Sequence, residues 1–68
     1  MAKAETTFAA RLRSLREAAG VNQSELARRA GLTRQALSML EAGERQPTLA
    51  TTQALARALG LTLDALAG

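Results

Sequence analysis

Apolar residues recur along this chain at intervals of three or four positions, in short runs that glycine interrupts. In the first run they would share one face of a helix: Phe8, Leu12, Leu15 and Ala19. Gly20, directly after this run, is typical of the residue that ends a helix. The pattern therefore predicts a helix from Thr6 to Ala19, preceded by a flexible arm over residues 1–5.

A second helix is expected from Asn22 to Gly31. The Asn22 side chain can accept a hydrogen bond from the amides of the first turn, and Glu25 three residues later would complete a capping box. Ala27 is small enough for another helix to cross closely. Gly31 suits the left-handed backbone that a tight turn between two helices requires.

A third helix is expected at 33–42, with Thr33 as its cap and Gly43 after its end. At about 100° per residue, Leu37 and Leu40 face the core. The residues expected on its outer face or in its exposed first turn are Arg34, Gln35, Ser38, Met39 and Ala42.

The remainder of the chain shows the same pattern of residues that begin and end helices. Pro47 biases the residue before it away from helical geometry, so a loop should separate the third helix from the next. Thr48 and Thr62 would open two more helices, and Gly60 would end the first of them. Their apolar residues are Leu55, Leu59, Leu63 and Leu66. No stretch has the pattern of a strand, so the sequence predicts an all-α fold, a compact bundle of about five short helices.

Length and composition narrow the classes of function. The 68 residues suffice for one small domain, 1–68. Cysteine and histidine are absent, so we expect no disulfide, no metal and no cofactor. No nucleophile–base pair and no phosphate-binding glycine loop can be recognised, so we do not expect an enzyme. Without a long apolar run or a signal-peptide pattern, we expect a cytoplasmic protein.

The charge is moderately positive. Nine basic and six acidic residues give a net charge of +3, and eight of the nine cations are arginine. A positive excess suits a polyanionic partner, and the arginine fork is shaped for bidentate contact with phosphate or guanine. A coding bias toward arginine explains the same numbers equally well.

The outer face of the third helix carries side chains that could read DNA. In the major groove, Arg34 could donate to two acceptors of guanine, Gln35 could bridge the donor and acceptor of adenine, and Met39 could touch a thymine methyl. Taken singly, each residue is equally typical of a solvated helix face. Met39 is also typical of a side chain that fills a gap beside the core. The combination with caps, a small residue and a glycine turn favours a helix-turn-helix.

The stretch from Phe8 to Leu66 resembles the lambda repressor/Cro-like family of helix-turn-helix proteins, also called the XRE family. The matching residues are Asn22, Gln23, Glu25, Leu26, Ala27, Gly31, Leu32, Thr33, Leu37, Leu40, Glu41, Gly43, Pro47, Leu59, Gly60, Leu63 and Leu66. The resemblance implies a sequence-specific binder of double-stranded DNA that regulates transcription, most often as a repressor, in a bacterial or phage context. Such proteins usually bind palindromic sites as homodimers, with half-sites about one helical turn apart.

The resemblance also implies roles for single residues. Four lie at positions that contact bases when the third helix enters the major groove: Arg34, Gln35, Ser38 and Met39. Four others would contact the phosphate backbone: Asn22, Gln23, Thr33 and Arg45. Helix N-termini attract anions, which fits Asn22 and Gln23, although capping alone also accounts for Asn22. In similar proteins the positions of Arg16 and Glu41 form a structural ion pair between helices.

The chain departs from the family pattern at four residues. Glu44 is acidic where lysine is common, and Met39 is apolar where a polar side chain is frequent. Both favour an alternative function, a protein-interaction module (antitoxin-like or adaptor) that uses the same bundle. Thr52 and Gln53 replace apolar residues in the fourth helix, so this part of the core is expected to be thin or to face a partner.

Three leucines near the end of the chain are candidates for an apolar dimer interface: Leu61, Leu63 and Leu66. Closure of the monomer core is the alternative explanation for the same residues. The two explanations differ in the exposure that they require, which a structure can measure.

Overall fold

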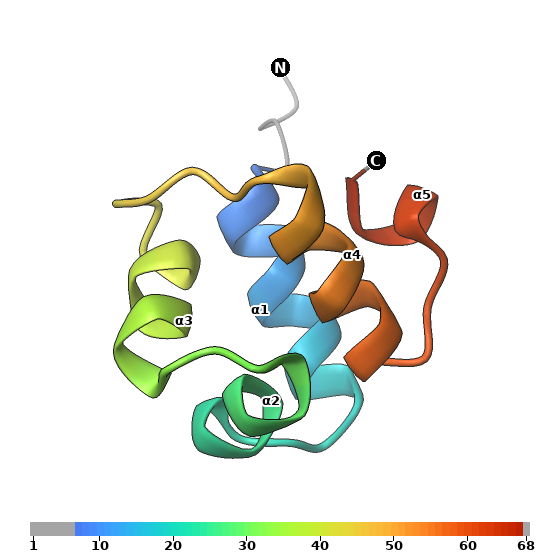
Figure 1. The fold of residues 1–68 in the computed structure, drawn as a ribbon. Coiled ribbons are helices and arrows are strands. Elements are labelled where there is room, and N and C mark those ends of the chain that lie inside the picture. The colour runs from blue at the N-terminus through green and yellow to red at the C-terminus, as the bar shows by residue number, and fades with distance from the viewer. Residues whose placement is uncertain (1–6, 68) are drawn as a thin grey trace, which may run out of the picture.

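A computed structural model describes residues 7–67 and contains helices but no strand within that range (Figure 1). The helices are α1 (Phe8–Ala18), α2 (Gln23–Ala30), α3 (Arg34–Glu41), α4 (Leu49–Ala58) and α5 (Leu63–Ala67). The predicted all-α bundle of about five short helices is therefore confirmed. The arm predicted over residues 1–5 lies outside the described residues.

The helix starts follow from short polar caps. An oxygen of Asn22, Thr33 or Thr48 accepts a hydrogen bond from the backbone N–H three residues later, at 2.8–3.0 Å. These three predicted caps are confirmed. Thr7 caps α1 in the same way, at 3.1 Å, so the first helix begins at Phe8 and not at Thr6. The cap oxygens satisfy amides that have no partner within the helix.

The predicted capping box at α2 is only half formed. Asn22 caps the helix, but the Glu25 carboxylate accepts from Arg28 at 2.6 Å and from Arg29 at 2.7 Å. Two guanidinium groups within one turn offer charge-assisted hydrogen bonds, which are stronger than a bond from a neutral N–H. The expectation that Glu25 closes the box was wrong.

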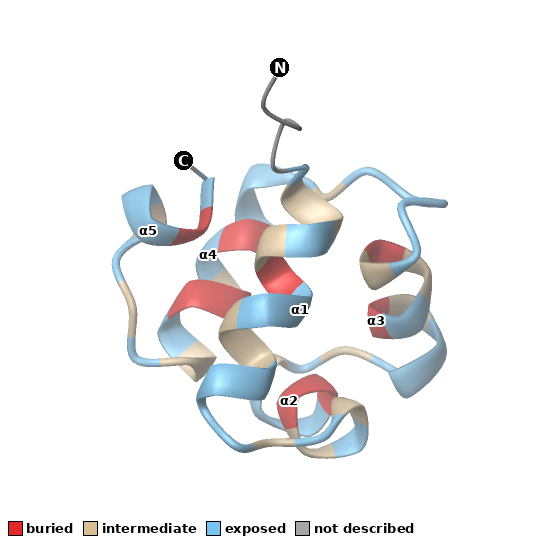
Figure 2. Ribbon diagram, turned by 180° about the vertical axis from the view of Figure 1, so that it is seen from behind, coloured by how far each residue is buried: buried red, intermediate tan, exposed pale blue. Residues whose placement is uncertain are grey.

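The core lies where the helices meet (Figure 2). Its buried apolar members are Leu12, Leu26, Ala27, Leu37, Leu40, Leu55, Ala56 and Leu66. Thr52 is 7% exposed, and its hydroxyl donates to the carbonyl of Thr48 at 2.9 Å. This bond lets a polar residue occupy the core at a position where the family pattern has an apolar one, whereas Gln53 is exposed.

The helix-turn-helix places α3 at one side of the molecule (Figure 1). Ala27 in α2 is 2% exposed, which agrees with the prediction that a small residue here lets another helix pack closely. Gly31 ends α2 with φ of 73°, and the next N–H, of Leu32, donates to the carbonyl of Ala27 at 2.8 Å. The glycine thereby turns the chain into α3 without a Cβ penalty. Within the described residues no helix is long and apolar enough to cross a membrane.

Candidate nucleic-acid interface

The outer face of α3 is polar. Leu37 and Leu40 are buried, and the side chains of Arg34, Gln35 and Ser38 are exposed, as the helical spacing predicts. Met39 differs from the expectation because it is half-buried. The residues that offer hydrogen bonds to a partner on this face are therefore Arg34, Gln35 and Ser38.

The N-terminus of α2 lies beside the start of α3. One surface hollow is lined by Arg16, Asn22, Gln23, Ser24 and Arg34. The structure thus brings together two residues predicted to contact phosphate and one predicted to contact a base. Amides at a helix start and the guanidinium of Arg34 make this hollow attractive to an anion.

An ion pair joins α1 to α3, and its arginine, Arg16, also lines this hollow. Arg16 Nε donates to Glu41 Oε2 at 2.6 Å, and Nη2 donates to Oε1 at 3.0 Å. The side chains are only 12% and 4% exposed. The hydrogen bond to Glu41 raises the pKa of Arg16 above its usual value, although burial opposes this. The predicted structural pair is confirmed.

Gln23 belongs to the same cluster. Its Nε2 donates to Glu41 Oε1 at 3.0 Å, and the residue is half-buried. Gln23 was expected only as a phosphate contact at a helix N-terminus, and its bond to Glu41 was not predicted. No signal in the sequence could have revealed it, because periodicity relates residues within one helix and not residues of two helices.

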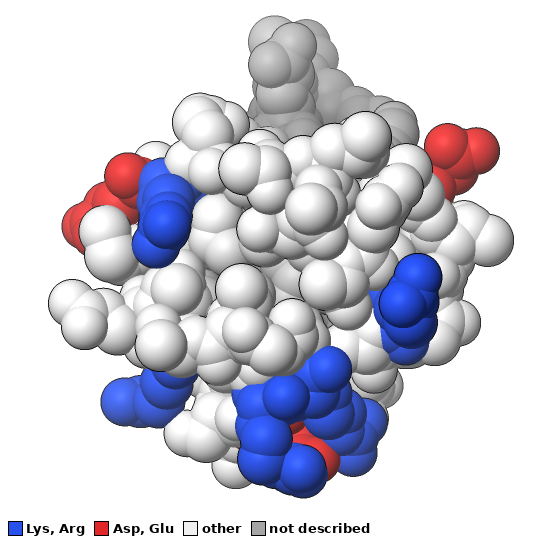
Figure 3. Space-filling model, viewed as in Figure 1, with Lys and Arg blue, Asp and Glu red and all other residues white. Residues whose placement is uncertain are grey.

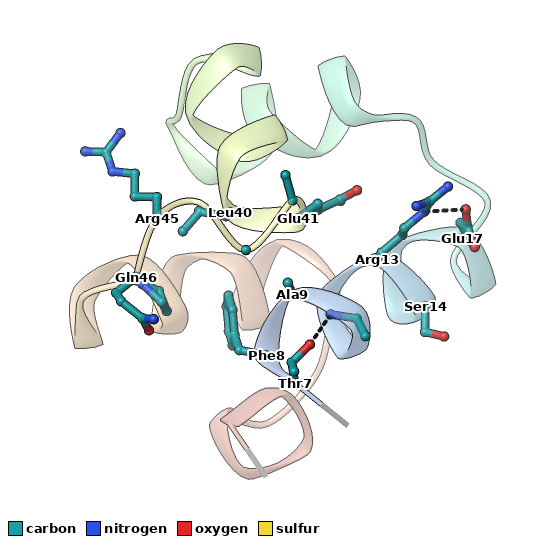
Figure 4. Close-up of a pocket in the computed structure, with 14 residues that line it drawn as sticks. Thr7, Phe8, Ala9, Arg13, Ser14, Glu17, Leu40, Glu41, Arg45 and Gln46 are labelled. Atoms are coloured by element: carbon teal, nitrogen blue, oxygen red, sulfur yellow. Dashed lines mark hydrogen bonds and ion pairs between the residues drawn. The ribbon is translucent and has the colours of Figure 1, made fainter. Parts of the chain in front are cut away.

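The loop after α3 carries Arg45 on the surface (Figure 4). Arg45 is one of the residues that line an open groove of about 580 Å³ between this loop and α1, and the end of its side chain extends out of the groove. Glu44 is exposed beside it. Thr33, also predicted to contact phosphate, is exposed, and its hydroxyl oxygen accepts the Ala36 N–H at 3.0 Å.

A second cluster of charges lies on the outer face of α2. Arg28 and Arg29 share the carboxylate of Glu25, and in Figure 3 basic atoms surround acidic atoms over this helix. The hydrogen bonds from Arg28 and then Arg29 lower the pKa of Glu25 below its ordinary value. Two cations against one anion leave this face positive.

The three C-terminal leucines differ in exposure. Leu66 is 0% exposed within the monomer core, so its assignment to a dimer interface was wrong and core closure explains it. Leu61 and Leu63 are half-buried and border a shallow groove with Gln53, Ala56 and Arg57. Only these two of the three leucines can reach a second chain.

Comparison with known proteins agrees with the geometry. A family model described as "Helix-turn-helix" matches residues 12–66. An uncharacterized HTH-type transcriptional regulator of Sinorhizobium fredii is 46% identical over 48 residues, which cover 71% of this chain and 62% of that protein. A similar regulator of Methanothermobacter thermautotrophicus is 45% identical over 49 residues, 72% of this chain and 71% of the relative. The chain thus spans less than two thirds of the first relative.

Solved structures show the same fold. The restriction-modification controller protein C.AhdI of Aeromonas hydrophila superposes with a TM-score of 0.87 at 38% identity, over 90% of this chain and 92% of that one. The DNA-binding domain of the P22 C2 repressor superposes with a TM-score of 0.87 at 28% identity, over 94% of this chain and 86% of that one. A hypothetical transcription factor of Neisseria superposes with a TM-score of 0.83 at 30% identity, over 97% of this chain and 85% of that one. The chain belongs to the lambda repressor-like helix-turn-helix family of DNA-binding transcriptional regulators.

Proposed function

We propose that this chain acts as a repressor that binds a specific site on double-stranded DNA, with α3 in the major groove. The observation that carries the proposal is the hollow between α2 and α3, where Asn22, Gln23 and Arg34 lie together. A helix N-terminus that holds a phosphate beside a helix that faces base edges is the geometry such docking needs. Because the DNA of a bacterium lies in its cytoplasm, we place the protein there.

Base reading is assigned to the exposed residues of α3. Arg34 would pair with the two acceptors of guanine, and Gln35 with the donor and acceptor of adenine. Ser38 lies just over one turn beyond Arg34 and would contact the next bases. Met39, half-buried, would reach only a thymine methyl at the edge of the interface.

Phosphate contacts are assigned to four residues whose side chains still have a hydrogen-bond donor available for a phosphate. Asn22 uses its side-chain oxygen for capping, at 2.8 Å from the Glu25 N–H, so its amide can still donate. Thr33 likewise caps with its oxygen and can donate its hydroxyl hydrogen. Gln23 has a second N–H beyond the one given to Glu41. Arg45 extends from the loop into solvent (Figure 4).

Dimerisation is assigned to the groove of α4 and α5. Leu61 and Leu63 are half-buried along it. A two-fold dimer would present two α3 helices to half-sites about 34 Å apart, one turn of DNA. The palindromic site of the proposal depends on this interface.

The test is selection of binding sites from random duplex DNA, followed by titration of variants. The Arg34→Ala variant is expected to lose about 1–3 kcal/mol of binding free energy and to relax preference at one base pair. The Gln23→Ala variant should weaken binding about equally for all sequences. The Arg28→Ala variant is a matched control, since it removes an exposed arginine of α2 that does not line the hollow and should keep the preference.

An unchanged site preference in the Arg34→Ala variant would refute the role of α3 as the reading helix. Absence of binding to any duplex at low salt would refute the DNA proposal as a whole. That result would favour the alternative, a protein-interaction module, for which exposed Leu49 (64%) on α4 is the apolar contact.

A further inference from the structure

We infer that Glu41 is a positioning residue for the phosphate contact, because it holds the Gln23 amide in the orientation that DNA requires. The inference rests on the proposed function, in which Gln23 donates to a phosphate. It adds a role for Glu41 beyond the ion pair with Arg16. Glu41 itself does not touch DNA.

The orientation of the Gln23 amide follows from the chemistry of its partner. An ionised carboxylate can only accept hydrogen bonds, so the amide must turn its NH₂ group toward Glu41 Oε1, 3.0 Å away. The flipped amide would face the carboxylate with its oxygen and would be repelled. One N–H is thus used inside, and the other diverges from Glu41 at the edge of the hollow in front of α2.

Arg16 makes this arrangement compatible with DNA. Its guanidinium donates to both oxygens of Glu41, at 2.6 and 3.0 Å, and to the carbonyl of Val21 at 2.9 Å, next to the α2 cap. The carboxylate charge, which would repel a phosphate, is therefore balanced at the point of contact. Glu41 can orient Gln23 without a net negative charge beside the backbone.

The physical consequence is preorganisation. A free glutamine loses side-chain entropy when it binds a phosphate, whereas a held one has already lost it on folding. From the usual cost of immobilising one side chain, release of Gln23 should weaken DNA binding about two- to tenfold. The loss should not depend on sequence, since phosphates carry no base information.

A double-mutant cycle tests this coupling. The full chain and the variants Gln23→Ala, Glu41→Met and their combination are titrated with a mixed-sequence duplex at low salt, at a temperature where circular dichroism shows each folded. If Glu41 acts through Gln23, Glu41→Met weakens binding about two- to tenfold alone and much less when it is combined with Gln23→Ala. The side-chain amide resonances of Gln23 should also shift toward those of a free glutamine in Glu41→Met.

The Arg13→Ala variant is the control, because it removes an exposed arginine of α1 that pairs with Glu17 and keeps the bond between Gln23 and Glu41. Its effect on binding should be the same in the unmodified chain and in the Gln23→Ala background. Equal losses from Glu41→Met in both backgrounds would overturn the inference and leave the DNA proposal standing. Unchanged binding in Gln23→Ala would instead refute the phosphate role of Gln23, on which the inference rests.

Discussion

Replacing Arg16 by Ala removes the centre of the contact between α1 and α3. The variant leaves the Glu41 carboxylate, 4% exposed, without the guanidinium that donates to both of its oxygens. It also frees the carbonyl of Val21, which accepts from Arg16 Nη1 at 2.9 Å. An uncompensated charge at low exposure is costly because few water molecules can replace the lost partner.

The expected loss of stability can be worked from this geometry. Breaking a buried pair by removing one partner costs about 3–5 kcal/mol. Because Gln23 still donates to Glu41 and solvent reaches 12% of Arg16, the lower end, about 3 kcal/mol, applies. The total free energy of unfolding of a domain of this size is about 3–10 kcal/mol. Since 1 kcal/mol shifts Tm by about 4–8 °C in so small a domain, Tm should fall by about 12–24 °C.

Thermal and urea unfolding, followed by circular dichroism, measure this change. The Arg13→Ala variant is a matched control, since the pair of Arg13 with Glu17 is 65% and 57% exposed at 3.4 Å and should contribute below about 1 kcal/mol. The double replacement Arg16→Met with Glu41→Met removes both charges and should regain most of the stability. A Tm of Arg16→Ala within about 4 °C of the unmodified chain would refute the reasoning.

Three further outcomes follow from the same structure. The pKa of the Glu25 carboxyl, measured by NMR, should lie below its ordinary value because Arg28 and Arg29 donate to it. Its small contribution to stability is present at neutral pH and lost as pH falls through that lowered pKa; an ordinary value that salt does not alter contradicts the pairing with Arg28 and Arg29. The Leu66→Ala variant should lose about 2–5 kcal/mol of unfolding free energy at every protein concentration. The Leu61→Ala variant should mainly raise the dissociation constant of the proposed dimer, measured by sedimentation. Gly31→Ala should lose about 1–2 kcal/mol from backbone strain alone, because a Cβ there meets no atom within 4 Å; a larger loss would point to a clash.

The helices could be predicted from the sequence because their signals are local. Asn22, Thr33 and Thr48 each cap an amide three residues away, and Gly31 turns the chain at its own φ. The spacing of Leu37 and Leu40 likewise needs only the geometry of one helix. Glu25 had two kinds of possible partner, a backbone N–H and nearby arginines, and it binds the arginines because charged partners form stronger hydrogen bonds.

The contacts within the candidate site required the fold, and Glu41 shows why. Its partners lie 25 and 18 residues away, on α1 and at the start of α2, and are brought together only when both helices pack against α3. The ion pair with Arg16 was expected because the family resemblance pointed to it, whereas the bond to Gln23 had no such precedent in the pattern. Yet it is this bond that decides what the carboxylate does at the surface. A pair of opposite charges alone would brace the helices, but a third partner with a spare N–H connects that brace to the place where a phosphate would bind. If α3 reads DNA as proposed, its stability and the geometry of the phosphate contact both depend on the Glu41 side chain, so selection for one constrains the other.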